Sequence, residues 1–214
     1  MIEPESARLD LAARSCNMPS SQNFQSKRDG IVELAKSVQT LSESDRRSVA
    51  GWAADCADRV LWLFEAENPH DDRPRAAIAR TRAFARGQAN TAEEIRRRFG
   101  GGNATHGISP AAAAAAKAAG QASAICHMGA HALGAAGYAV KAASLAASDQ
   151  AEAAENEIRW QLQHMTSDVR SALRSFPPVG ENRSGPLGPG LLASGQIGMI
   201  IRQLQTRIAE NQAH

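Results

Sequence analysis

The chain has 214 residues, of which 43% are hydrophobic and 21% are charged, a composition typical of a globular protein with a sizeable core. Its formal net charge of +2 lacks the basic excess of general nucleic-acid or membrane-surface binders, so we expect neither partner. The cysteines Cys16, Cys56 and Cys126 are widely spaced, which argues against a disulfide framework or a zinc ribbon. The N-terminal sequence has acidic residues and no apolar core, so we expect it not to act as a secretory signal and expect a cytoplasmic protein.

Helical periodicity recurs along the chain, and no strand-length window alternates apolar with polar residues. The sequence therefore predicts an all-α multi-helix bundle. Residues 1–28 are polar and serine-rich and are expected to form a flexible tail, followed by a helical domain over residues 29–176. Within that domain the spacing of apolar residues and caps predicts successive helices, over residues 30–41, 42–68, 70–87, 91–103, 110–148 and 151–176.

Residues 110–148 are unusually rich in alanine, and Gly120 is the strongest candidate for a turn or kink within them. We expect this segment to form a central helical hairpin. Residues 177–190 are rich in proline and glycine and are predicted to be a linker. The amphipathic helix predicted over residues 191–214 should dock on the main body or on another chain, which would form a homo-oligomer.

Two histidines, His127 and His131, lie four residues apart in the alanine-rich segment and would share one face of a continuous helix with Tyr138 and Lys141. Two histidines at this spacing can bind a metal, but the glutamate of the HExxH motif is absent, so no metal site is predicted. The remaining alternatives are buried histidines hydrogen-bonded to an aspartate or a carbonyl, and acid–base catalysts in a pocket.

A second candidate cluster is HDDRPR, which contains Asp71, Asp72, Arg73 and Arg75. It is either a helix start with acidic caps or a charged site that binds a ligand through the bidentate arginine fork. Asp55 is a third candidate. It lies in a helix whose neighbouring residues Trp52 and Cys56 are expected to be buried, so we expect Asp55 to pair with a histidine or an arginine. We found no phosphate loop, dinucleotide fingerprint or nucleophile elbow, and we expect no cofactor.

Several of these uncommon elements occur together in a recognisable order. WAADCADRVLW (52–62) precedes DDRPRAAIARTRAFARG (71–87), which is followed by AICHMGAHALGAAGYAVKAA (124–143) and NEIRWQ (156–161). Over roughly residues 41–173 the chain resembles the helical domain of the bacterial putative immunity proteins, departing from the pattern at Phe84, where the family usually has tryptophan. The resemblance implies that the family pattern includes the candidate residues Asp55, Asp71, Asp72, Arg73, Arg75, His127, His131, Tyr138 and Lys141.

Two functional hypotheses follow. The resemblance implies an immunity-type binding protein that neutralises a toxin or binds another protein partner. The alternative is a small-molecule-binding protein or an enzyme, such as one of a biosynthetic pathway, with a pocket of Asp, Arg, His and Tyr side chains. In this second hypothesis His127, His131, Asp55 and Tyr138 are the catalytic candidates, and the ligand-binding candidates are Asp71, Asp72, Arg73, Arg75, Trp52 and Lys141.

Overall fold

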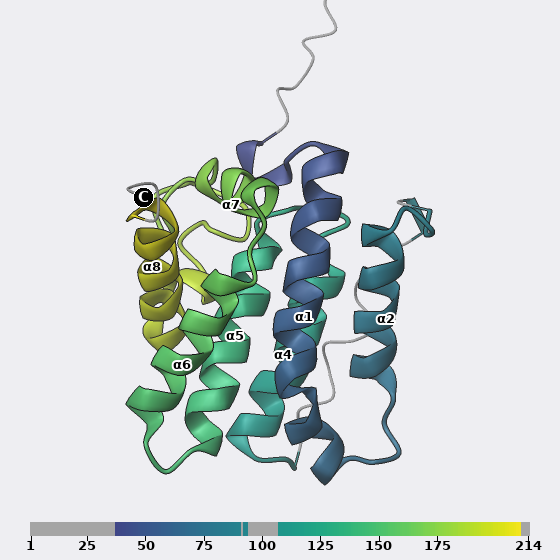
Figure 1. Cartoon of the computed structure of the whole chain (residues 1–214), viewed down its shortest axis with the longest axis vertical. Coiled ribbons are helices and arrows are strands. Elements are labelled where there is room, and N and C mark those ends of the chain that lie inside the picture. The colour runs from purple at the N-terminus through teal and green to yellow at the C-terminus, as the bar shows by residue number, and fades with distance from the viewer. Residues whose placement is uncertain (1–36, 91, 94–106, 211–214) are drawn as a thin grey trace, which may run out of the picture. The chain divides into compact units, whose positions relative to one another are not determined.

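The computed structural model describes residues 37–90, 92–93 and 107–210, and within them it confirms the predicted all-α class (Figure 1). The predicted tail over 1–28, most of the helix over 30–41 and most of the helix over 91–103 lie outside the described residues. No helix in the described part is long and apolar enough to cross a membrane. The elements are η2 (Val38–Thr40), α1 (Glu43–Glu67), α2 (Arg73–Ala85), α4 (Pro110–Ser123), α5 (His131–Ala146), α6 (Gln150–Gln163), α7 (Ser167–Arg174), η3 (Leu191–Ala193) and α8 (Gly195–Glu210).

Local capping signals set the start of most helices. Ser42 caps α1 by accepting a hydrogen bond from the Asp45 backbone N–H at 3.0 Å, and Ser109 caps α4 in the same way. Prolines in the first turn begin α2 and α4, where the missing N–H has no consequence. The predicted helices over 42–68 and 70–87 are therefore found as α1 and α2.

The alanine-rich segment forms a hairpin of α4 and α5 at the centre of the bundle, as predicted. Small side chains let the two helices and their neighbours approach closely, because a Cβ on Gly134 would meet the Gln121 amide and one on Gly137 would meet Ile201 of α8. In Figure 1, α1 lies in front of this hairpin, with α2 to one side and α6 and α8 to the other. The core is therefore built around short side chains rather than large ones.

The turn of this hairpin is at residues 124–130, and the expectation that the chain turns at Gly120 was wrong. Gly120 lies inside α4, where the surrounding alanines sustain the helix despite a glycine cost of about 1 kcal/mol. The turn is held by contacts distant in sequence, since the backbone N–H groups of Gly129 and Ala130 donate to the carbonyls of Thr40 and Gln39. Tertiary hydrogen bonds thus decide where the alanine-rich helix ends.

The helix predicted over residues 151–176 is divided in two. Asp149 caps α6, and Thr166 caps α7 by accepting a hydrogen bond from the Val169 N–H at 3.3 Å. The interruption lets the buried residues of α7 turn toward α1 and α8. The prediction of amphipathic helix on both sides was confirmed, but the prediction of one continuous helix across residues 164–166 was wrong.

The segment after α7 is packed into the same body. Val179 and Leu187 are buried, and the fully buried Gln39 amide accepts from the Leu187 N–H at 2.9 Å and donates to the Ser184 carbonyl at 2.7 Å. The predicted apolar stripe of α8 is buried against α5 of the same chain, with Ile201 against Gly137. That stripe is consequently not exposed for pairing with a second copy.

Candidate functional site

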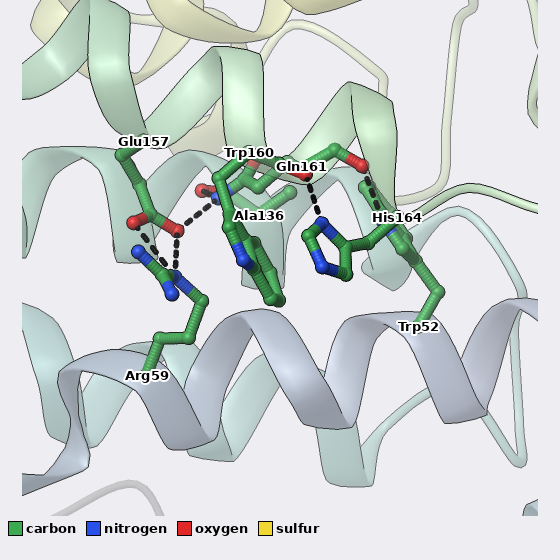
Figure 2. A network of polar contacts seen from close by, with 7 residues as sticks. All are labelled: Trp52, Arg59, Ala136, Glu157, Trp160, Gln161 and His164. Atoms are coloured by element: carbon green, nitrogen blue, oxygen red, sulfur yellow. Dashed lines mark hydrogen bonds and ion pairs between the residues drawn. The ribbon is translucent and has the colours of Figure 1, made fainter.

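One flank of α1 is joined to α6 by a network of buried polar side chains (Figure 2). Trp52, only 4% exposed, donates its indole N–H to the Gln161 carbonyl at 3.0 Å. The fully buried Gln161 side chain donates in turn to the Ala136 carbonyl of α5 and to Glu157 Oε1, both at 3.2 Å. Three helices are thereby connected through one tryptophan and one amide.

The charged end of this network joins Arg59 to Glu157. The Arg59 guanidinium lies 3.0 Å from Glu157 Oε2, and the Glu157 side chain is only 5% exposed. The same guanidinium lies 3.9 Å from the centre of the Trp160 ring, which stacks on His164 at 4.0 Å between ring centroids. Arg59 is therefore held from two sides while 40% of its side chain stays exposed.

Cys56 lies within this flank and is fully buried. Burial raises the pKa of its thiol well above the ordinary value, and the negative charges of Glu157 and Asp55 raise it further. A thiol held protonated is a poor nucleophile. Cys56 is therefore a packing residue, and the network around it offers no reactive sulfur.

The opposite flank of α1 faces α2 through exposed ion pairs. Arg82 lies 2.7 Å from Asp55 and 3.1 Å from Asp58, and Arg75 lies 2.6 Å from Glu65. Asp55 is thus paired with an arginine, as one of the sequence hypotheses held. All of these side chains are at least partly open to solvent, which limits what each pair contributes to stability.

The HDDRPR cluster is at the start of α2. Asp71 binds the Arg73 guanidinium at 2.6 Å and accepts from its backbone N–H at 3.1 Å, and this contact holds the pKa of the Asp71 carboxyl below its ordinary value. Asp72 occupies the N-cap position but makes no side-chain cap bond. Arg73 and Arg75 bind separate carboxylates, Asp71 and Glu65, so the two arginines do not converge on one point.

The two histidines do not share a helix face, and the expectation that they do was wrong. His127 is exposed in the turn that joins α4 and α5, whereas His131 begins α5 and its Nδ1 lies 2.8 Å from the Gln121 amide oxygen. This turn bonds to Thr40, just before α1, whereas the HDDRPR cluster follows the other end of α1. The 25 residues of α1 therefore separate the turn that contains His127 from the HDDRPR cluster by roughly 35 Å.

The other candidates lie along α5. Tyr138 is buried, which raises the pKa of its phenol, and the Lys117 ammonium lies 5.8 Å from its ring. Lys141 is half-buried one turn further on. Two hollows lined by described residues, one between α7 and α8 and one beside η2 and the start of α1, have none of the predicted site residues in their lining. Nor could any group of three or more His, Cys, Asp and Glu side chains in the described ranges hold a metal ion.

Sequence reasoning missed the exposed large hydrophobic residue of α1, Trp62, which is 61% open to solvent. It lies one helical turn from Arg59, Asp58 and Glu65 and faces solvent between the two flanks. We call the surface formed by Asp55, Asp58, Arg59 and Trp62 the α1 face. Sequence reasoning also passed over Glu157 and Gln161 as individual residues, although the NEIRWQ element that contains them was part of the resemblance.

Comparison with known families shows the protein family to which this helical bundle belongs. Residues 39–168, more than half of the chain, match the family described as Imm-5 like putative immunity protein. That range begins at the buried Gln39 and ends in the first turn of α7, so it includes both flanks of α1 and the central hairpin. Comparison with curated proteins and with solved structures finds no match. The chain belongs to the Imm-5 like putative immunity protein family.

Proposed function

We propose that this protein is an immunity-type binding protein that neutralises a toxin by binding it through the α1 face. The observation that carries the proposal is the family match over residues 39–168, which contains the whole of α1. Under this proposal the chain acts by covering its partner rather than by turning over a substrate. It needs a rigid scaffold and an exposed anchor, and both are features of α1.

The chemistry of the α1 face supports a protein partner. Tryptophan and arginine are the residues that most often dominate binding energy at protein interfaces. Trp62 is exposed, and Arg59 beside it is already held by Glu157 and the Trp160 ring. A side chain fixed before binding loses less conformational entropy on association, which favours affinity.

The ion pairs beside Trp62 suit the rim of such an interface. Arg82 bridges Asp55 and Asp58, so this part of the surface presents paired charges rather than a strong field of one sign. We therefore expect affinity to depend on Trp62 and Arg59, with the Asp55 and Asp58 carboxylates contributing mainly to specificity and to the rate of association.

Co-expression with candidate toxins encoded beside this chain's gene tests the proposal. The wild-type chain should restore growth of cells that produce the cognate toxin, and the purified pair should form a one-to-one complex in titration calorimetry. A matched empty vector and a toxin from an unrelated system are the controls. Failure to restore growth against every neighbouring toxin, with no complex formed, would overturn the proposal.

The alternative hypothesis, a small-molecule-binding protein or an enzyme, remains a prediction with less support. It placed Asp55, His127, His131 and Tyr138 with the arginines of the HDDRPR cluster in one pocket. The separation of His127 from that cluster by the length of α1 does not favour a shared site. Asp55 and Arg75 instead form exposed ion pairs between α1 and α2, with Arg82 and Glu65 respectively.

A further inference from the structure

The C-terminal half of α1 carries more negative than positive charge. Residues 55–67 contain four carboxylates and one arginine, although the whole chain has a formal net charge of +2. The arginine, Arg59, is already compensated by the buried Glu157 carboxylate of α6, as Figure 2 shows, so it does not offset the acids of α1. Of the four carboxylates, Glu65 has an arginine of its own, Arg75 of α2, at 2.6 Å.

Two of the other carboxylates share a single arginine of α2. The Nη2 atom of Arg82 lies 2.7 Å from Asp55 Oδ1 and 3.1 Å from Asp58 Oδ2. Because both distances are to the same nitrogen, the two carboxylates converge on one point, and one of their two negative charges is left uncompensated. The side chains of Asp55 and Asp58 are 55% and 37% exposed, and within the described residues neither Asp55 Oδ2 nor Asp58 Oδ1 accepts a hydrogen bond. These oxygens are therefore available to a further donor.

Trp62 lies beside this pair of carboxylates. Asp55, Asp58 and Trp62 follow one another at spacings of three and four residues, so they are neighbours along one side of α1. The Trp62 side chain is exposed, and a tryptophan ring attracts a cation over its face more strongly than other aromatic rings do. The combination suits a basic side chain, which has an apolar stem and a cationic head.

We propose that the toxin binds the α1 face through a lysine or arginine side chain, whose stem covers Trp62 and whose cationic head binds the carboxylates of Asp55 and Asp58. This inference rests on the proposed function, because it names the chemistry of the partner at the same surface. An acidic side chain of the toxin would add to the excess of carboxylates, and an apolar one would bury them without a new partner. A basic side chain compensates the remaining charge.

Titration of hexalysine into the full chain, followed by NMR of the tryptophan indole N–H signals, tests this chemistry without a toxin. At a salt concentration of about 10 mM, attraction between exposed charges is screened little. Hexalysine should shift the Trp62 signal and leave the signal of the buried Trp52 unchanged, and hexaglutamate should shift neither. Absence of a Trp62 shift with hexalysine, or a larger shift with hexaglutamate, would overturn the proposal.

Three variants locate the peptide and fix the sign of the effect. Asp55→Asn should weaken hexalysine binding about two- to fivefold, as expected for one exposed ion pair. Arg82→Gln should instead strengthen it by a similar factor, because the two carboxylates lose the counter-charge they share. Glu181→Gln is the matched control, since Glu181 is exposed outside the family-matched range, and it should bind like the wild type. Wild-type affinity in folded Asp55→Asn, or no gain in folded Arg82→Gln, would contradict the assignment.

A second arm with the cognate toxin separates this inference from the proposed function. In stopped-flow measurements, Asp55→Asn should slow association and reduce its dependence on salt, whereas Glu181→Gln should do neither. If the toxin binds the wild type and its association is unaffected in Asp55→Asn, the inference fails and the immunity function stands. If hexalysine behaves as predicted but no toxin binds, the proposed function fails and the preference of the surface for a basic side chain stands.

Discussion

The two flanks of α1 hold the bundle together in different ways. Toward α2 the helices pack closely, with Gly51 opposite Ala85, and the polar contacts between them are exposed ion pairs. Toward α6 the helices lie farther apart, and long side chains fill the space with hydrogen bonds that water does not reach. Loss of any one polar contact on the α2 flank should therefore reduce stability only slightly. On the α6 flank, stability depends on each of the hydrogen-bonded side chains.

The two tryptophans of α1 provide the largest contrast. Trp52→Ala should lower the free energy of unfolding by about 3–5 kcal/mol, because it leaves a cavity in the core and removes the hydrogen bond to Gln161. Trp62→Ala on the exposed face should change it by less than about 0.5 kcal/mol. Urea unfolding of both variants measures the difference. Similar losses of unfolding free energy in the two variants would contradict the assignment of Trp52 as buried and Trp62 as exposed.

Two arginines of similar exposure show the electrostatic difference between the two flanks of α1. Arg59 and Arg82 are 40% and 36% exposed, but Arg59 pairs with a buried carboxylate and Arg82 with exposed ones. Arg59→Ala should cost about 2–3 kcal/mol, since Glu157 loses its counter-charge while buried. Arg82→Ala should cost less than about 1 kcal/mol. An equal cost for both, again by urea unfolding, would contradict the proposed division.

A smaller effect is expected from a single hydrogen bond. Trp52→Phe keeps most of the buried ring and removes the N–H that binds the Gln161 carbonyl, so we expect a loss of about 1–1.5 kcal/mol. Trp62→Phe is the control and should leave the melting temperature unchanged. If Trp52→Phe is as stable as the wild type, the link between α1 and α6 depends on packing alone.

The smallest effect concerns pH. Ser109 donates its hydroxyl and its backbone N–H to Glu67 at 2.5 and 2.7 Å, and these bonds lower the pKa of the Glu67 carboxyl below its ordinary value of 4.5. A lowered carboxyl pKa stabilises the fold above about pH 4.5, and this contribution is lost as the pH falls through the folded-state pKa. NMR titration should show the Glu67 pKa rising toward 4.5 in Ser109→Ala. An unchanged pKa would show that the contact is absent in solution.

The helices of the α2 flank were predictable because their signals are local. Ser42 caps α1, Pro74 begins α2, and the apolar spacing within each helix shows its buried face. The turn between α4 and α5 was not, because alanine favours helix on every face and the carbonyls that hold this turn come from Gln39 and Thr40. The local sequence does not show which distant residues will form hydrogen bonds with the turn.

The candidate site shows the same limit. Asp55 was expected to pair with a histidine or an arginine, and its partner is Arg82, which could not be chosen from the sequence. The network of the α6 flank joins residues as far apart as Trp52 and Gln161, which are separated by 109 positions. Only the resemblance connected these segments. Trp62 was missed because its exposure follows from how α1 packs against its neighbours, which the sequence of the helix does not show.

Titration of the cognate toxin against Trp62→Ala tests the central claim, that the α1 face binds the partner, most directly. Met199→Ala is the matched control, because Met199 is 62% exposed on α8, outside the family-matched range. We predict that Trp62→Ala weakens toxin binding by roughly thirtyfold or more, as expected for a hot spot of at least about 2 kcal/mol, with an unchanged melting temperature. Met199→Ala should bind like the wild type. Wild-type affinity in folded Trp62→Ala would contradict the claim.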